Sequence, residues 1–304
     1  MMFLANNLLP AWPSQLRRAG VLGMNGRNMN LLVRLNPKKL YPLADDKVQT
    51  KELCAHHAIR VPRTYAILDH PVQVKPARWL LDRLGEFVVK PARGSGGRGV
   101  LVVGGRSDGG FLASDGRHLP WGEVHYHLQA TLAGAFSIGG RPDRVIIEQR
   151  IARHAAFDGL AIGGTPDVRL IVYRGCVIMA MLRLPTRRSG GRANLHQGAL
   201  GLGLDIARGV STGGVCVGKA VDAHPDTGAP LAGVAVPHWA AVLETARKLA
   251  AAIGLGYLGV DIVLGPREPL VLEANGRPGL SIQVANRRGL LKRITEAETQ
   301  MTNS

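Results

Sequence analysis

The sequence is short of cysteine, aromatic and acidic residues. Its 304 residues include three cysteines, 5% aromatic side chains, and 22 Asp and Glu against 38 Lys and Arg. The cysteines, Cys54, Cys176 and Cys216, form no CxxC pair, so neither a zinc site nor a disulfide framework is indicated and a reduced, cytoplasmic setting is expected. No apolar run of about 18 residues occurs, which predicts a soluble protein without a transmembrane helix.

The shortage of acidic residues leaves a formal net charge of +16. Such a surplus indicates an anionic partner, namely nucleic acid, an anionic membrane, phosphates or an acidic peptide. Only nine of the basic residues are lysines, and the others are arginines. Arginine suits bidentate contact with phosphate or carboxylate. The base composition of the genome explains most of these arginines equally well. The 46% apolar content excludes intrinsic disorder as the main state, and the length suggests about two domains.

Residues 1–44 are expected to form an irregular extension with short helices. No basic residue precedes the first apolar stretch, which Pro10 and Pro13 interrupt, so a signal peptide is not indicated. Residues 1–20 are apolar with a basic end, a pattern that can lie on a membrane surface. A short helix packed on the body of the protein is the favoured interpretation.

The remaining pattern of apolar residues predicts a mixed α+β protein with largely antiparallel sheets. Helices are expected to begin at Asp46 and end before Pro62, and to cover 238–253. Strands are expected at 86–90, 100–103, 144–147, 168–173, 177–182, 257–264 and 270–274. Residues 104–140 are rich in glycine and give no clear prediction.

A glycine-rich loop, GSGGRG at 94–99, lies between two of these predicted strands. A following strand rather than a helix excludes a dinucleotide-binding fold, and the lack of a Gly-Lys-Ser/Thr ending excludes a P-loop. A flap of this kind can fold its backbone N–H groups over the phosphates of a nucleotide, as in protein kinases, although no HRD or DFG sequence is present. Ser95, Gly96, Gly97 and the preceding Lys90 are therefore candidate phosphate contacts, with a flexible hairpin as the alternative.

Two acidic residues face each other in a predicted hairpin near the C-terminus. If the hairpin is centred on Arg267 with a three- or five-residue loop, Asp261 lies opposite Glu273, and Asn275 shares their face. Adjacent carboxylates repel each other, whereas Mg²⁺ held jointly with substrate phosphates would stabilise them. Unrelated surface acids, or pairing of Asp261 with an arginine, are the alternatives.

Residues 182–203 form an arginine-rich segment that also contains His196. The segment fits either a solvated loop or a nucleic-acid patch, but it lacks the interleaved aromatic residues of single-strand binders. His196 alone is more often structural than catalytic. The group Glu123, His125 and His127 is expected to lie on the surface rather than to bind a metal.

Together these segments resemble the ATP-grasp superfamily, and within it the RimK-type α-L-glutamate ligase-like proteins. The matching stretches follow the family's order and are DDKVQTKELCAHHAIRVP, VVKPARGSGGRGV, IIEQRI, PDVRLIV, MLRLP, RANLHQG, GVDIV and LEANGRPGL. The resemblance implies an ATP-grasp fold, with two α+β lobes holding ATP between antiparallel sheets. Residues 1–44 would be a reduced N-terminal extension, 45–140 the lobe with the flap, and 141–304 the lobe with the adenine hinge and the metal-binding hairpin.

The resemblance also implies roles for individual residues. ATP contacts are expected from Lys47, Lys90, Ser95, Gly96, Gly97, Asp167, Arg192, Asn194 and the hinge residues Gln149, Arg150 and Ile151. The phosphate and acyl-phosphate site would comprise Arg183, Arg192 and Asn194. Two Mg²⁺ ions, with Mn²⁺ as an alternative, would be held by Asp261, Glu273 and Asn275. His196 and Arg277 are candidate substrate contacts, Arg277 because Gly276-Arg277 replaces the Ala-Ser that the family has before Pro-Gly-Leu.

The activity that this resemblance implies is ATP-dependent carboxylate–amine ligation through an acyl phosphate, with release of ADP and phosphate. The partners would be ATP, a peptide or small carboxylate, and the amine of glutamate or another amino acid. RimK-type ligases have a fuller domain before the core, so the acceptor and any self-association stay open. A basic nucleic-acid-binding protein and a nucleotide-binding pseudoenzyme are the alternatives.

Overall fold

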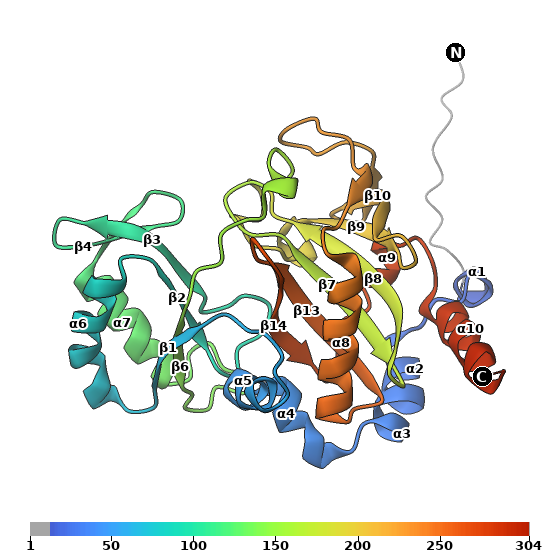
Figure 1. The fold of residues 1–304 in the computed structure, drawn as a ribbon, viewed down its shortest axis with the longest axis horizontal. Helices are drawn as coiled ribbons and strands as arrows, with labels where there is room; N and C mark the ends of the chain where they lie inside the picture. Colours follow the sequence, from blue (N-terminus) through green and yellow to red (C-terminus); the bar gives the residue numbers. More distant parts are fainter. Residues whose placement is uncertain (1–12, 304) are drawn as a thin grey trace.

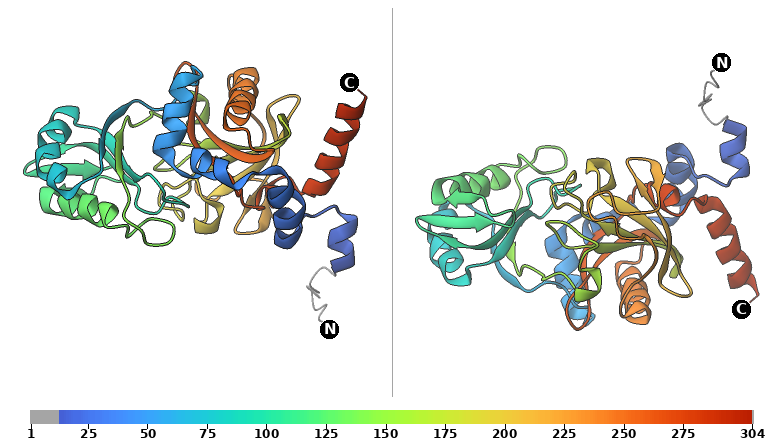
Figure 2. Two further views of the ribbon diagram at one scale, coloured as in Figure 1. Left: turned by 90° about the horizontal axis from the view of Figure 1, so that it is seen from below. Right: turned by 90° about the horizontal axis from the view of Figure 1, so that it is seen from above.

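The structure, a computed structural model, describes residues 13–303. The chain forms a smaller and a larger lobe side by side, and the first and last helices lie together at the outer end of the larger lobe (Figures 1 and 2). Among residues 13–303, no helix is long and apolar enough to cross a membrane. Helices packed on antiparallel sheets confirm the predicted α+β class.

The smaller lobe is built on a six-stranded antiparallel sheet in the order β1-β6-β2-β3-β4-β5. Its strands are β1 (Thr64–Leu68), β2 (Phe87–Pro91), β3 (Leu101–Ser107), β4 (Gly110–Ala113), β5 (His118–Pro120) and β6 (Val145–Glu148). The turn η3 (Pro71–Gln73) leads into α6 (Val74–Leu84), and α7 (Trp121–Leu132) lies beside it on the sheet. Helix α6 buries Val74, Ala77 and Leu81, which share one helical face, and Gly85 ends it with a left-handed φ of 71°.

The larger lobe is built on an eight-stranded antiparallel sheet in the order β11-β10-β9-β8-β7-β13-β14, with β12 paired to β10. Its strands are β7 (Asp167–Tyr173), β8 (Cys176–Leu184), β9 (Leu200–Asp205), β10 (Val210–Cys216), β11 (Lys219–Val221), β12 (Ala232–Ala235), β13 (Tyr257–Leu264) and β14 (Pro269–Asn275). The helical elements of this lobe are η4 (Ala155–Phe157), η5 (Leu195–Gln197), α8 (Trp239–Ile253), α9 (Ile282–Ala285) and α10 (Leu290–Thr302).

Alternation along the strands gives this sheet two different faces. Even-numbered residues such as Leu170, Leu182 and Val260 pack with the buried side of α8 in one core. Odd-numbered residues such as Ile171 and Met179 pack in a second core with the N-terminal helices, α9 and α10. Figure 1 shows α8 in front of the sheet and α10 at its outer edge. We call the face that carries the odd-numbered residues the odd face. It is covered by helices at its outer end, and toward the smaller lobe it carries polar residues.

The N-terminal extension consists of short helical pieces, as predicted for its described part. They are α1 (Pro13–Arg18), α2 (Met24–Gly26), η1 (Arg27–Leu32), α3 (Val33–Leu35), η2 (Lys38–Leu40) and α4 (Tyr41–Asp45). Helix α5 (Lys47–His56) follows, and the Asp46 side chain caps it by accepting hydrogen bonds from the backbone N–H groups of Val48 and Gln49. Residues 1–12 lie outside the described residues, and they make up much of the segment for which a packed helix was favoured over a membrane-surface segment.

The predicted strands and the 238–253 helix are all present, but two details differ. Strand β6 pairs with β1 and β2, so it belongs to the smaller lobe although the sequence placed it in the lobe beginning at 141. The β13–β14 turn comprises four residues, 265–268, rather than three or five. A register shift next to Asp261 compensates for this difference, and Asp261 still faces Glu273 as predicted.

Candidate functional site

The candidate site lies where the odd face of the larger sheet meets the smaller lobe. Asp261 on β13 is flanked by Arg169 on β7 and by Glu273 on β14, and Gly259 pairs with Asn275 one step along the hairpin. Arg183 on β8 lies opposite Asp167 on β7. Sequence periodicity therefore brings the predicted acidic and basic residues onto one surface.

Asp261 is the centre of a buried ion-pair network, which is the arginine alternative considered from the sequence. Its Oδ1 accepts a hydrogen bond from Arg169 Nε at 2.6 Å, and its Oδ2 accepts one from Arg183 Nη2 at 2.9 Å and a very short one from Arg169 Nη2. Arg183 also binds both oxygens of Asp167, at 2.5 and 2.6 Å. Arg169 was not among the predicted site residues, because its partner is 92 residues away in the sequence.

The network shifts the pKa values of its two aspartates in opposite directions. Burial raises the pKa of Asp167 to about 6, although the Arg183 guanidinium opposes this shift. Burial also disfavours ionised Asp261, but Arg169 and Arg183 outweigh it and hold its pKa well below the usual range. Asp261 is consequently the permanent anion of the cluster.

The hairpin offers the hard oxygen atoms that Mg²⁺ prefers. A carboxylate has about four lone-pair positions, and the arginines occupy three of those on Asp261, which leaves one on Oδ1. Glu273 is partly exposed and its Oε1 lies 3.4 Å from Asn275 Nδ2. These residues fit an ion that takes its other ligands from phosphates and water, and no group of three or more His, Cys, Asp and Glu among the described residues is placed to hold one alone.

Lys47 joins three parts of the site. Its Nζ lies 3.2 Å from Glu273 Oε2 and donates a hydrogen bond to the carbonyl oxygen of Gly94 at 2.8 Å. It thereby connects the start of α5, the hairpin of the larger lobe and the root of the glycine-rich loop. Lys47 is one of the predicted phosphate contacts, and the structure holds it between the loop and the acidic hairpin.

The second predicted lysine belongs to a buried triad in the smaller lobe. Lys90 Nζ lies 2.6 Å from Glu148 Oε1, and Lys51 Nζ lies 2.8 Å from Glu148 Oε2. Burial lowers the pKa of Lys90, and Glu148 opposes this by stabilising the ammonium. Neither Lys51 nor Glu148 was a predicted site residue, although a carboxylate ending the apolar strand VIIE was an available signal.

The glycine-rich loop connects β2 to β3, as the flap prediction requires. Gly96 and Gly97 have left-handed φ values of 65° and 75°, which a side chain would strain. The carbonyl oxygen of Gly96 accepts a hydrogen bond from Asn194 Nδ2 at 3.0 Å, across from the other lobe. The exposed Arg192 lies beside Gly97, and Ser95 is half-buried within the loop. The flap therefore contacts the arginine-rich segment of the larger lobe.

His127 is not the surface residue that the sequence suggested. It is half-buried, its Nε2 lies 3.0 Å from the carbonyl oxygen of Gly99, and its ring stacks on Phe136. An added Cβ at Gly99 would lie 2.5 Å from Phe136, so glycine is required there. These contacts fix the far end of the flap.

The hinge candidates follow β6 directly and lead the chain into the larger lobe. The backbone N–H of Gln149 donates to Arg63 O at 2.8 Å, and Arg150 pairs at the surface with Glu86 at 3.1 Å. The carbonyl oxygen of Ile151 accepts a hydrogen bond from Thr165 Oγ1 at 3.1 Å. Their position between the lobes agrees with a hinge, and the predicted adenine contact remains a prediction.

The two candidate substrate residues differ in how they are held. Arg277 Nη1 lies 2.5 Å from Asp45 Oδ2, and its guanidinium stacks 3.8 Å from the ring centre of Tyr41. An added Cβ on Gly276 would come within 2.5 Å of the same ring. Gly276 and Arg277 therefore pack against the end of the N-terminal extension and the residue that follows it. The sequence alone did not suggest this contact. The His196 side chain is exposed.

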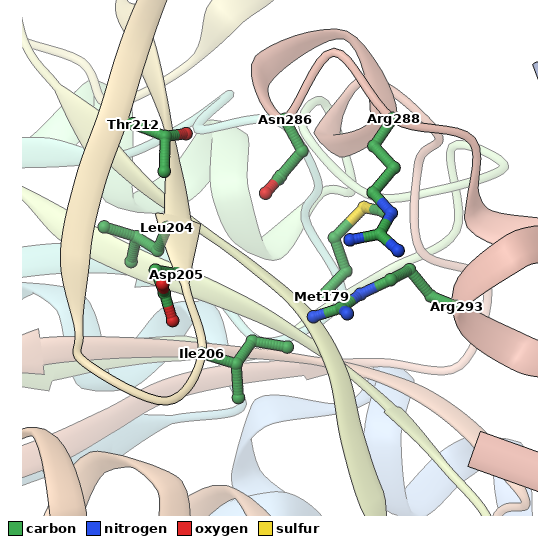
Figure 3. Close-up of a pocket in the computed structure, with 8 residues that line it drawn as sticks. All are labelled: Met179, Leu204, Asp205, Ile206, Thr212, Asn286, Arg288 and Arg293. Carbon is green, nitrogen blue, oxygen red and sulfur yellow. The ribbon is translucent and has the colours of Figure 1, made fainter. Parts of the chain in front are cut away.

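A separate pocket of about 240 Å³ lies at the outer end of the larger lobe (Figure 3). It is lined by Met179, Leu204, Asp205, Ile206, Thr212, Asn286, Arg288 and Arg293. Figure 3 shows Arg288 and Arg293 on one side and Asp205 on the other. The predicted site residues do not line this pocket, and Glu296 pairs with both arginines.

The two lobes, the flap and the charged hairpin define a protein of the ATP-grasp class. A family model described as sugar-transfer associated ATP-grasp matches residues 26–299, and the chain belongs to this family. The superfamily predicted from the sequence is therefore confirmed.

The chain is also similar to individual known proteins. The chain is 25% identical over 266 residues to a probable alpha-L-glutamate ligase of Aeromonas salmonicida (strain A449), which covers 86% of this chain and 66% of that protein. The solved ATP-grasp ligase PsnB, complexed with minimal precursor, is 16% identical with a TM-score of 0.47, covering 88% of this chain and 63% of PsnB. A RimK domain ATP-grasp protein from Sphaerobacter thermophilus DSM 20745 is 15% identical with a TM-score of 0.47, covering 86% and 70%. The chain spans about two thirds of the length of the curated relative.

Proposed function

We propose that this protein is an ATP-dependent carboxylate–amine ligase. It would join an amino acid such as glutamate to a peptide or small carboxylate, in keeping with its family and its likeness to a probable alpha-L-glutamate ligase. The observation that carries the proposal is the position of Lys47, whose ammonium contacts both the flap at Gly94 and the carboxylate of Glu273. A phosphate entering between flap and hairpin would meet this lysine.

The chemistry has two steps, and both transfer groups between substrates. A carboxylate oxygen of the first substrate attacks the γ-phosphorus of ATP, the bond to the bridging oxygen breaks, and ADP leaves with an acyl phosphate formed. The nitrogen lone pair of the amine then attacks the acyl carbon. The C–O bond to phosphate breaks, and the nitrogen loses a proton as the amide forms.

The chain's own residues position the reactants and neutralise charge. Lys47 and Lys90 would bind the phosphates beneath the backbone N–H groups of Ser95, Gly96 and Gly97. Gln149, Arg150 and Ile151 would contact the adenine, and Asp167 would lie on the ribose side. Arg183, Arg192 and Asn194 would hold the transferred phosphoryl group and the acyl phosphate.

Asp261, Glu273 and Asn275 would hold Mg²⁺. The bound ion would supply neutralisation of the triphosphate charge. Arg169 and Arg183 would orient Asp261 by fixing both of its oxygens. This arrangement leaves one lone-pair position of Oδ1, which also accepts from Arg169 Nε, for the ion.

The test incubates the full chain with Mg-ATP and pools of amino acids and peptides, with mass-spectrometric detection of amides and separate quantification of ADP and AMP. We expect ADP and phosphate in amounts equal to the amide product. Release of AMP and pyrophosphate would contradict the proposal. ATP binding without turnover in any pool would instead support the pseudoenzyme alternative.

A further inference from the structure

The first 44 residues have a charge of one sign. They contain six basic side chains, Arg17, Arg18, Arg27, Arg34, Lys38 and Lys39, and the first acidic residue in the chain is Asp45. All 22 acidic residues therefore lie in the remaining part of the sequence. The basic residues are about as dense here as in the rest of the chain, so the local surplus arises because acidic residues are absent, and it points to a surface with an anionic partner.

Large apolar side chains are exposed among these basic residues. Leu16, Met24, Met29 and Val33 are 44%, 66%, 63% and 71% exposed, and they make up four of the twelve strongly exposed large apolar side chains in residues 13–303. We define the N-terminal surface as these four residues with the exposed Arg17, Arg18, Arg34, Lys38 and Lys39. Its five basic side chains form no ion pair with any other described residue.

The N-terminal surface is held in place by the fold. Leu22, Leu31 and Leu32 on the inner side of the same helices are buried in the core shared with α9 and α10. Gln283 fixes the backbone of Leu22 by accepting from its N–H at 2.8 Å and donating to its carbonyl at 3.0 Å. Figure 2 shows these helices at the outer end of the larger lobe, away from the smaller lobe. The helices that carry the exposed apolar residues are therefore anchored to the core and lie apart from the strands that carry the candidate site.

We propose that the N-terminal surface binds an anionic lipid membrane. Basic side chains beside exposed apolar ones match a bilayer interface, where anionic headgroups lie next to acyl chains.

Two other occupants fit the surface less well. A second copy bound through the same face would bring basic side chains against basic side chains, which is repulsive in a two-fold interface. Nucleic acid would satisfy the charges but would leave Met24, Met29 and Val33 against phosphate. The membrane is the partner that uses both features.

The experiment measures co-sedimentation of the full chain with two kinds of vesicle, equal phosphatidylglycerol and phosphatidylcholine, and phosphatidylcholine alone. We expect binding to the anionic vesicles only, decreasing as salt is raised. Replacing Lys38 and Lys39 together by glutamine should weaken binding about 30-fold, because each basic residue near an anionic surface contributes about fivefold. The matched control is Lys75→Gln, an exposed lysine of the smaller lobe, and it should have no effect.

The apolar contribution has its own matched pair. Val33 and Val72 are 71% and 72% exposed, and Val72 lies on the smaller lobe. Val33→Asp should weaken vesicle binding, whereas Val72→Asp should leave it unchanged. Equal binding to both vesicle types, no binding to either, or equal effects of the two valine substitutions would overturn the proposal. Stronger binding to a DNA duplex than to anionic vesicles, or a dimer abolished by Val33→Asp, would also overturn it.

Discussion

Substituting Asp261 by asparagine should separate two roles that the same side chain has in the structure. Asp261 accepts three hydrogen bonds from Arg169 and Arg183, and it is a predicted magnesium ligand. Glu273, its neighbour across the hairpin, shares the predicted metal role but has a different setting. Its side chain is 25% exposed, whereas that of Asp261 is 2% exposed.

The expected losses of stability differ because the two carboxylates are buried to different extents. Removing one partner of a buried ion pair costs about 3–5 kcal/mol, since an uncompensated charge remains. In Asp261→Asn the loss falls on Arg169, which keeps only the longer 3.8 Å pair with Glu273, whereas Arg183 keeps Asp167. Glu273→Gln removes partly exposed pairs with Lys47 and Arg169, for which about 1 kcal/mol each is an upper value.

Urea unfolding and ADP release, measured on the same preparations, test this difference. Both substitutions should reduce turnover by more than the roughly 10–100-fold that is typical of residues that only position metal ligands. Only Asp261→Asn should lower the free energy of unfolding by more than about 3 kcal/mol. The control is Glu268→Gln, a half-exposed residue in the turn of the same hairpin that pairs with Arg60 at the surface; it should leave turnover unchanged and alter stability by less than about 1 kcal/mol. Equal losses of stability in the Asp261 and Glu273 variants would refute the reasoning.

Three further predictions concern the lysine triad and the N-terminal contacts. Replacing Glu148 by glutamine should lower the pKa of Lys90 further, because burial already lowers this pKa and Glu148 opposes the shift. ATP affinity measured by calorimetry should therefore decrease more steeply with rising pH than in the wild type. Parallel pH profiles of the two proteins would contradict this prediction. Arg277→Ser should lower the free energy of unfolding, measured with urea, by about 1 kcal/mol and leave the KM for the carboxylate unchanged. A higher KM at unchanged stability would instead show that Arg277 contacts the substrate. Gly276→Ala should destabilise the protein by about 1–3 kcal/mol through overlap with Tyr41, and a double-mutant cycle with Tyr41→Ala should remove most of this cost; an undiminished cost would exclude the contact.

Local patterns predicted the hairpin well. The opposition of Asp261 and Glu273 follows from the turn and the two-residue strand period, and the register shift preserved it. The flap could be predicted equally well, because the strand, the glycine run and the next strand follow one another directly in the sequence. The helix α7 was missed within 104–140, although Trp121, Val124 and Leu128 have helical spacing.

Contacts between distant segments were beyond the sequence. Arg169 meets Asp261 only because β7 pairs with β13, and Lys51 meets Glu148 only because α5 lies against the smaller sheet. The choice of strand neighbours depends on packing of the whole core, which local periodicity does not encode. The contacts of Arg277 were beyond the sequence for the same reason, since its partners Tyr41 and Asp45 are more than 200 residues earlier in the chain, and its predicted substrate contact stays a prediction.

Transfer of oxygen from the carboxylate substrate to phosphate tests the proposed ligation most directly. Once a substrate pair is found, its carboxylate is labelled with ¹⁸O and the inorganic phosphate is analysed by mass spectrometry. An acyl-phosphate mechanism predicts one labelled oxygen in each phosphate released with ADP. Unlabelled phosphate, or label recovered in AMP, would contradict the account.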